Sequence, residues 1–182
     1  MDSLLVALLI AVLATAAYTD LRSARIPNSL AFSAMGIGLT AHGWVSGFDG
    51  LLFSLVGLGI GFGLFLVLYL SGGLAAGDVK LMGAVGAIVG PLGALTAVFL
   101  TIVIGGIYGV SAMCHQWGIR ATTRKLAYAT HGAIFRGPEK WSEELGLPFR
   151  LRYGIAIAGG TLLYMMGVHP FGEWAMFGSP VR

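Results

Sequence analysis

The chain contains few charged residues. Asp, Glu, Lys and Arg make up 10% of its 182 residues, whereas hydrophobic residues make up 57%, and the mean hydropathy is +0.85. Soluble domains contain about 25% charged residues. This deficit excludes a soluble globular domain and predicts an all-α polytopic membrane protein with a single domain over residues 1–182.

Cysteine is nearly absent as well. The single cysteine, Cys114, excludes an internal disulfide and any Cys-x-x-Cys metal site. His115 and His131 have no partner at a metal-binding spacing, so we expect no metal and no organic cofactor. The net charge is +3, but the basic residues are distributed as membrane topology requires. That distribution predicts contact with membrane lipids and argues against nucleic acid as a partner.

Six apolar runs are expected to be membrane helices, since a crossing needs about 20 apolar residues. One run, Leu81–Gly90, is shorter and is taken as a tilted or partly buried helix that stops at Gly90-Pro91. The first run should be retained, because the Met-Asp-Ser before it lacks the positive charge of a signal peptide. The predicted spans are Ser3–Thr19, Leu30–Trp44, Leu51–Leu70, Leu81–Gly90, Leu92–Cys114 and Tyr153–Val168.

The basic residues predict the orientation. With six spans, ten of the eleven Lys and Arg residues lie on one side of the membrane, and only Arg182 lies on the other. The positive-inside rule assigns the basic side to the cytoplasm, so both termini are predicted outside. Residues 115–152 then form a cytoplasmic loop, either a plain connector or partly an amphipathic helix on the inner leaflet.

Two aspartates stand out because each lies at the cytoplasmic end of a predicted span. Asp20 closes the first span, and Asp78 follows the third. An ionisable side chain near the membrane boundary is costly unless it is solvated, paired or used in function. Two carboxylates at the same depth predict an aspartic peptidase.

The chemistry of such a pair requires closeness. Adjacent carboxyl groups share one proton, because both cannot ionise cheaply side by side. The ionised group takes a proton from water while the protonated group donates to the scissile carbonyl, which gives a tetrahedral diol without a covalent intermediate. The groups must lie about 3 Å apart, so the first span should pack against the third or fourth. We assign no separate acid and base, because a coupled pair titrates as a unit.

The residues around both aspartates resemble the type IV prepilin peptidase family. The resemblance includes Asp20-x-Arg22-x-x-x-Ile26-Pro27-Asn28, Gly77-Asp78-Val-Lys80, Gly86-x-x-x-Gly90 and Tyr153-Gly154. It implies that Asp20 and Asp78 are the catalytic pair. It also implies an endopeptidase of the bacterial inner membrane that removes a short basic leader from prepilins or pseudopilins, cutting after a glycine at the cytoplasmic face.

Two departures from the family pattern are informative. Ala75 stands where the Gly-x-Gly-Asp motif of the family begins with glycine, which bears on local backbone freedom. The chain also lacks the insert with paired Cys-x-x-Cys motifs that larger members carry, so it resembles the short type associated with Flp (tight-adherence) pili. We therefore expect no methyltransferase activity. The alternatives are an archaeal-type preflagellin peptidase, a small membrane transporter and a noncatalytic assembly subunit.

Five neighbouring residues are predicted to support the site. Gly77 should provide backbone freedom and room for substrate directly before Asp78. Lys80 could stabilise the ionised form of Asp78 or, like Arg22, anchor to lipid phosphates. Pro27 and Asn28 are predicted to form the turn and N-cap of the second span. The oligomeric state is not predicted.

Glycines in the third span predict close helix packing. Their spacing gives two small-xxx-small faces, Gly57 with Gly61 and Gly59 with Gly63. Faces of this kind let two membrane helices approach closely.

Overall fold

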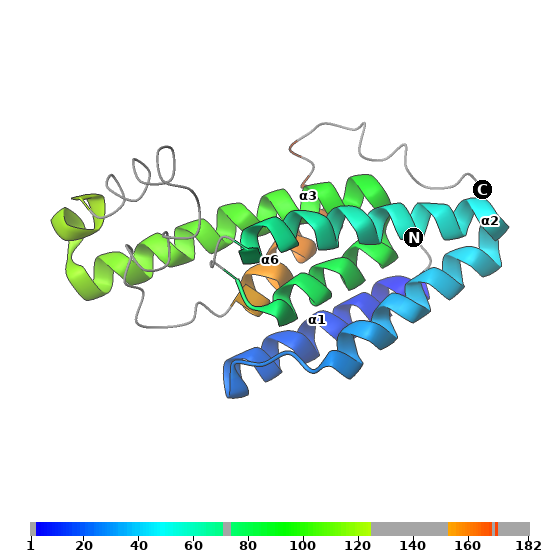
Figure 1. The fold of residues 1–182 in the computed structure, drawn as a ribbon, viewed down its shortest axis with the longest axis horizontal. Coiled ribbons are helices and arrows are strands. Elements are labelled where there is room, and N and C mark those ends of the chain that lie inside the picture. The colour runs from blue at the N-terminus through cyan, green and yellow to red at the C-terminus, as the bar shows by residue number, and fades with distance from the viewer. Residues whose placement is uncertain (1–2, 71–73, 125–152, 169, 171–182) are drawn as a thin grey trace.

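The computed structural model describes residues 3–70, 74–124, 153–168 and 170, and the remaining residues are drawn as a thin grey trace (Figure 1). Within these ranges the chain is helical and has no strand, which confirms the all-α prediction. The helices are α1 (Ser3–Ser23), α2 (Asn28–Leu70), α3 (Ala76–Trp117) and α6 (Tyr153–Met165). The first three are long and apolar enough to cross a membrane, and α6 is apolar but shorter.

The helices α2 and α3 each contain a sharp break. The backbone leaves the helical region at Gly47 (φ 60°, ψ −137°) in α2 and at Gly90 (φ 80°, ψ −176°) in α3. Both ribbons turn back on themselves at the right of Figure 1. Each helix is therefore an antiparallel pair of segments, and the breaks fall between the predicted spans. Six crossings with both termini outside remain a prediction.

Polar side chains of α2 satisfy the backbone at the α3 break. Pro91 has no N–H to donate to the carbonyl four residues earlier, and that carbonyl, of Ala87, instead accepts a 2.7 Å hydrogen bond from Ser54 Oγ. The next carbonyl, of Ile88, lies 2.9 Å from His42 Nε2. Because a carbonyl only accepts, this ring nitrogen must carry the proton. Such partners matter in a membrane, where no water replaces them.

The most extensive packing joins α2 to α3, and one of the two predicted glycine faces makes it. A Cβ on Gly57 would collide with the carbonyl oxygen of Gly86, and a Cβ on Gly61 would lie 2.5 Å from that of Met82. Gly59 and Gly63 have no atom within 4 Å of such a Cβ. The two backbones are thus close along the Gly57/Gly61 face, while side chains added at Gly59 or Gly63 would begin in open space.

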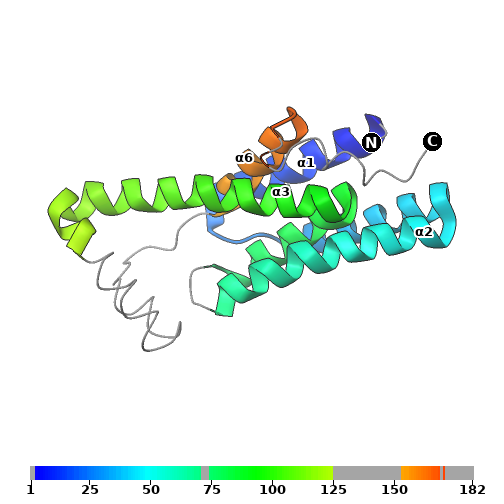
Figure 2. The same ribbon diagram turned by 90° about the horizontal axis from the view of Figure 1, so that it is seen from above.

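Helix α6 separates α1 from most of α3. It packs extensively on α3 and also on α1, whereas α1 and α3 share only a small direct contact. Figures 1 and 2 both show α6 beside these two helices. Smaller contacts join α1 to α2 and α3 directly, so the packing of the first span against the third or fourth stays a prediction. The largest partner of α1 is instead α6, a helix distant in sequence.

The predicted loop 115–152 is described only in part. Helix α3 continues through His115 to Trp117. A turn at Gly118 (φ 76°) follows it, and residues 119–124 are helical. The rest of the predicted loop, with His131, lies outside the described residues.

Candidate active site

Asp20 continues the buried face of α1. The buried residues Leu9, Leu13, Ala16 and Asp20 recur every three or four positions, which is the spacing of one helix face. The helix runs on to Ser23, beyond the predicted end of the span at Thr19, so Asp20 lies in its last turn. Its side chain is only 6% exposed.

The first turn of α6 holds the Asp20 carboxylate. The backbone N–H of Gly154 donates a 2.9 Å hydrogen bond to Asp20 Oδ2. N–H groups in the first turn of a helix have no partner within the helix, and the helix dipole favours negative charge there. The Asp20 carboxyl group is therefore a hydrogen-bond partner for the start of a helix far away in sequence.

Asp78 occupies the first turn of its own helix. Helix α3 begins at Ala76, five residues before the predicted start at Leu81, so Asp78 does not precede the helix. Its Oδ2 accepts a 2.9 Å hydrogen bond from the N–H of Ala75, as an acidic residue does at this position of a capping box. The side chain is 3% exposed.

Ala75 is accommodated without strain. Its backbone (φ −95°, ψ 153°) is ordinary extended geometry that any residue adopts. Alanine therefore adopts the backbone conformation of this position without strain, although the family motif has glycine here.

The start of α6 bonds to one aspartate and lies within electrostatic range of the other. Gly154 binds Asp20 as described, and the neighbouring Tyr153 interacts electrostatically with Asp78. Asp20 and Asp78 are the only buried ionisable side chains among the described residues. Two buried carboxyl groups, each oriented by a backbone N–H, can act as an acid–base pair.

Gly77 packs against the segment that leads into α2, and its predicted role toward substrate stays a prediction. It lies in regular helix, and a Cβ added there would come within 3.2 Å of Ile26 Cβ. The glycine thus makes room for the segment that leads into α2. This contact joins the two sequence motifs, since Ile26 belongs to the Asp20 motif and Gly77 to the Asp78 motif.

Lys80 and Asn28 form a second link between these motifs. Lys80 Nζ donates a 2.9 Å hydrogen bond to Asn28 Oδ1 and lies 5.4 Å from the centre of the Phe32 ring. The Asn28 side chain therefore binds Lys80, whereas an N-cap was predicted. Helix α2 begins at Asn28, and the preceding Pro27, which is exposed, offers its carbonyl to the N–H of Ala31 at 3.4 Å.

We expect this link to contribute modestly to activity. Lys80→Met and Asn28→Ala should each lower the rate of peptide cleavage by about two- to tenfold, because an exposed hydrogen bond contributes about 0.5–1.5 kcal/mol. The double variant should be no slower than the slower single variant, because both changes remove one interaction. Fully additive losses in a double-mutant cycle would contradict the link.

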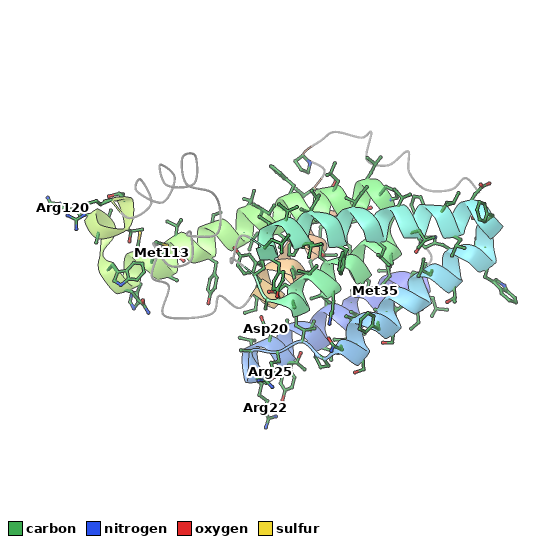
Figure 3. The ribbon with its side chains drawn as sticks, viewed as in Figure 1. Asp20, Arg22, Arg25, Met35, Met113 and Arg120 are labelled. Atoms are coloured by element: carbon green, nitrogen blue, oxygen red, sulfur yellow. The ribbon has the colours of Figure 1, made fainter. Side chains whose placement is uncertain are left out.

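Arg22 extends away from the site. It is exposed, and its Nη1 donates a 2.9 Å hydrogen bond to the hydroxyl of Tyr18 on the same helix. Figure 3 shows Arg22 and the exposed Arg25 near the end of α1 that carries Asp20, with Arg22 directed outward. This placement suits a side chain at the membrane surface, and a direct role in the site stays a prediction.

Sequence reasoning missed Tyr153 and Gly154 as members of the site. The Tyr-Gly pair was noticed only as part of the family resemblance, without a role. Nothing in its local pattern shows that it meets two aspartates from other helices. The resemblance was the only signal that could have found it.

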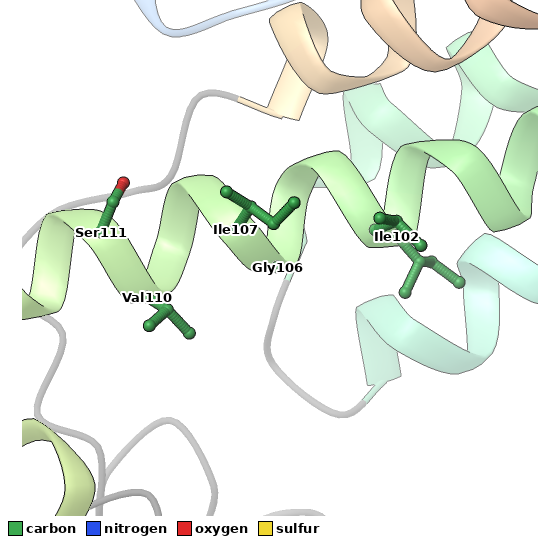
Figure 4. Close-up of a pocket in the computed structure, with 6 residues that line it drawn as sticks. Ile102, Gly106, Ile107, Val110 and Ser111 are labelled. Carbon is green, nitrogen blue, oxygen red and sulfur yellow. The ribbon is translucent and has the colours of Figure 1, made fainter.

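A surface hollow is lined by neither aspartate. It runs along the second segment of α3 (Figure 4) and contains no ionisable side chain, so it offers no acid–base chemistry. Within the described part of the chain, no cluster of three or more His, Cys, Asp or Glu side chains is arranged to hold a metal. The residues that line the hollow are Ile102, Val103, Gly106, Ile107, Val110 and Ser111.

Comparison with known families identifies a match to a peptidase family. Residues 7–110 match the type IV leader peptidase family. The matched region contains both aspartates and ends before α6. No curated protein and no solved structure matches the chain.

Proposed function

Because the chain belongs to the type IV leader peptidase family, we propose that it is a membrane-embedded aspartic endopeptidase with Asp20 and Asp78 as its catalytic pair. Its substrates would be Flp-type prepilins or pseudopilins, cut at the cytoplasmic face of the bacterial inner membrane. The observation that carries the proposal is the burial of these two carboxyl groups beside one helix start. Buried ionisable groups in membrane helices are a default sign of function.

The proposed reaction uses the pair as a shared acid and base. The ionised carboxylate removes a proton from a water molecule as its oxygen attacks the scissile carbonyl carbon. The protonated carboxyl group donates its proton to the carbonyl oxygen, so that a neutral tetrahedral diol forms. Proton transfer to the peptide nitrogen then accompanies cleavage of the C–N bond. The two N–H donors, from Gly154 and Ala75, keep the carboxylates oriented throughout.

The position of the pair supports a substrate that enters from the membrane surface. Asp78 lies in the first turn of α3 and Asp20 in the last turn of α1. The basic leader would remain in the cytoplasm and approach as an extended segment. A transporter that relays protons would instead place its carboxylates near the middle of the membrane.

The proposal is tested by incubating the full chain, reconstituted in lipid nanodiscs, with a purified Flp-type prepilin. Intact mass analysis should show loss of the leader after a glycine. The new terminus should stay unmethylated when S-adenosylmethionine is present, and EDTA should not slow cleavage. A prepilin with alanine for the glycine at the cleavage site is the control. Failure of the folded chain to cut any Flp-type prepilin would overturn the proposal.

A further inference from the structure

Tyr153 lies at the start of α6, where this helix packs on α1 and α3. It is the first residue of α6 and is half-buried, and its ring packs directly against the backbone of α3 at Gly105. A Cβ on Gly105 would lie 2.5 Å from Tyr153 Cε1 and 3.2 Å from Cζ. Only glycine leaves this space, so the ring rests on a surface that sets its position.

The residue also adjoins the hydrogen bond that holds Asp20. The next residue, Gly154, donates its N–H to Asp20 on α1, while the Tyr153 phenol interacts electrostatically with Asp78 on α3. The start of α6 therefore bonds directly to Asp20, and the Tyr153 phenol lies within the electrostatic influence of Asp78. The reaction of two carboxyl groups leaves this phenol without a role.

We propose that Tyr153 is a third catalytic residue, whose phenol donates a hydrogen bond to the carbonyl oxygen of the substrate as that oxygen gains negative charge. This inference rests on the proposed peptidase function. The phenol keeps its proton throughout, so the balance of the reaction is unchanged: the water proton goes to one carboxylate, and the other carboxyl group protonates the carbonyl oxygen. The phenol strengthens its hydrogen bond as the charge develops and weakens it when the diol collapses.

The setting suits this role. A donor stabilises a transition state most when it is oriented beforehand and shielded from water. The Gly105 contact provides the orientation, and partial burial provides the shielding. At neutral pH a phenol is a neutral O–H donor, since its ordinary pKa is about 10.

The test is Tyr153→Phe, which removes the hydroxyl and keeps the ring on Gly105. We expect kcat for prepilin cleavage to fall about a hundredfold, the usual effect of losing one donor to a developing oxyanion. KM should change by no more than about twofold, because the lost interaction forms only in the transition state. A ring that merely fills space would leave kcat unchanged.

The matched control is Tyr164→Phe. Tyr164 is a half-buried tyrosine on the same helix, and its hydroxyl packs near Gly93, where an added Cβ would lie 2.7 Å away. Its loss should change kcat by less than about threefold. Thermal unfolding in nanodiscs should be measured for both variants, so that changes in stability are separated from changes in rate.

The outcomes separate this inference from the proposed function. Asp20→Asn and Asp78→Asn are measured alongside. If both are inactive and only Tyr153→Phe lowers kcat among the tyrosine variants, the inference stands. If both are inactive but Tyr153→Phe keeps its kcat, or changes only KM, the inference is wrong and the peptidase proposal stands. If either Asp variant is fully active, both fail.

Discussion

Replacing Asp20 or Asp78 by Asn should abolish processing of a co-expressed Flp-type prepilin, with a loss of at least about a thousandfold in rate. Asparagine has nearly the shape of aspartate and keeps an oxygen that can accept the N–H of Gly154 or Ala75. It cannot share or transfer a proton as a carboxyl group does. The fold should therefore survive while the chemistry is lost. The conversion of prepilin to its shorter product on a denaturing gel, with membrane levels of each variant checked, measures the effect.

The same change at Asp49 is the matched control. Asp49 is an exposed aspartate of α2, and Asp49→Asn should process the prepilin like wild type. The double variant Asp20→Asn/Asp78→Asn should be no slower than either single variant, because the two groups act as a unit. Full processing by either single variant would rule out the aspartic mechanism.

Gly154→Ala should also lower the rate of prepilin cleavage strongly, although it changes no polar side chain. The added methyl group would lie 2.8 Å from Asp20 Oδ2 and 3.0 Å from Asp20 Cβ. Either Asp20 or the start of α6 must move, and the hydrogen bond between them would lengthen. A displacement of about 1 Å at a reacting group can cost a hundredfold in rate, so we expect a loss of about that size in kcat.

Gly159→Ala on the same helix separates this effect from the general loss of a glycine. There the nearest atom to the added methyl group would be Ile104 Cδ1 at 3.4 Å, which is an ordinary contact with a flexible side-chain end. Its processing rate should stay within about threefold of wild type. Equal rates for the two glycine variants would show that the α6 start does not position Asp20.

Much of the fold was accessible from the sequence because lipid imposes simple requirements. Apolar runs that cross a membrane are expected to form helices, because a helix pairs the backbone N–H and C=O groups of a span within the span itself. The predicted stop at Gly90-Pro91 coincides with the break in α3, because proline lacks the N–H that the helix needs. The helix ends were less accurate: α1 continues to Ser23 and α3 begins at Ala76. Hydropathy marks where a helix leaves the apolar region, and polar residues can extend the helix beyond that point.

Helix partners were beyond the reach of the sequence. Apolar residues cover all sides of these helices, so no stripe shows which side packs against protein and which against lipid. The glycine spacing predicted two packing faces in α2, but only the one with Gly57 and Gly61 meets α3. The choice depends on the shape of the opposing helix.

The sequence by itself therefore determined the class of protein, its helical segments and the two aspartates that a membrane helix would not carry without a use for them. Only the tertiary structure decided how the site is assembled. It packed α6 against both α1 and α3, so that the N–H of Gly154 binds Asp20 and the Gly105 backbone supports the Tyr153 ring. The physical reason is that an ionisable residue beside an apolar run can be recognised from the local sequence alone. The partners of that residue come from helices far apart in the chain, and only packing brings them together.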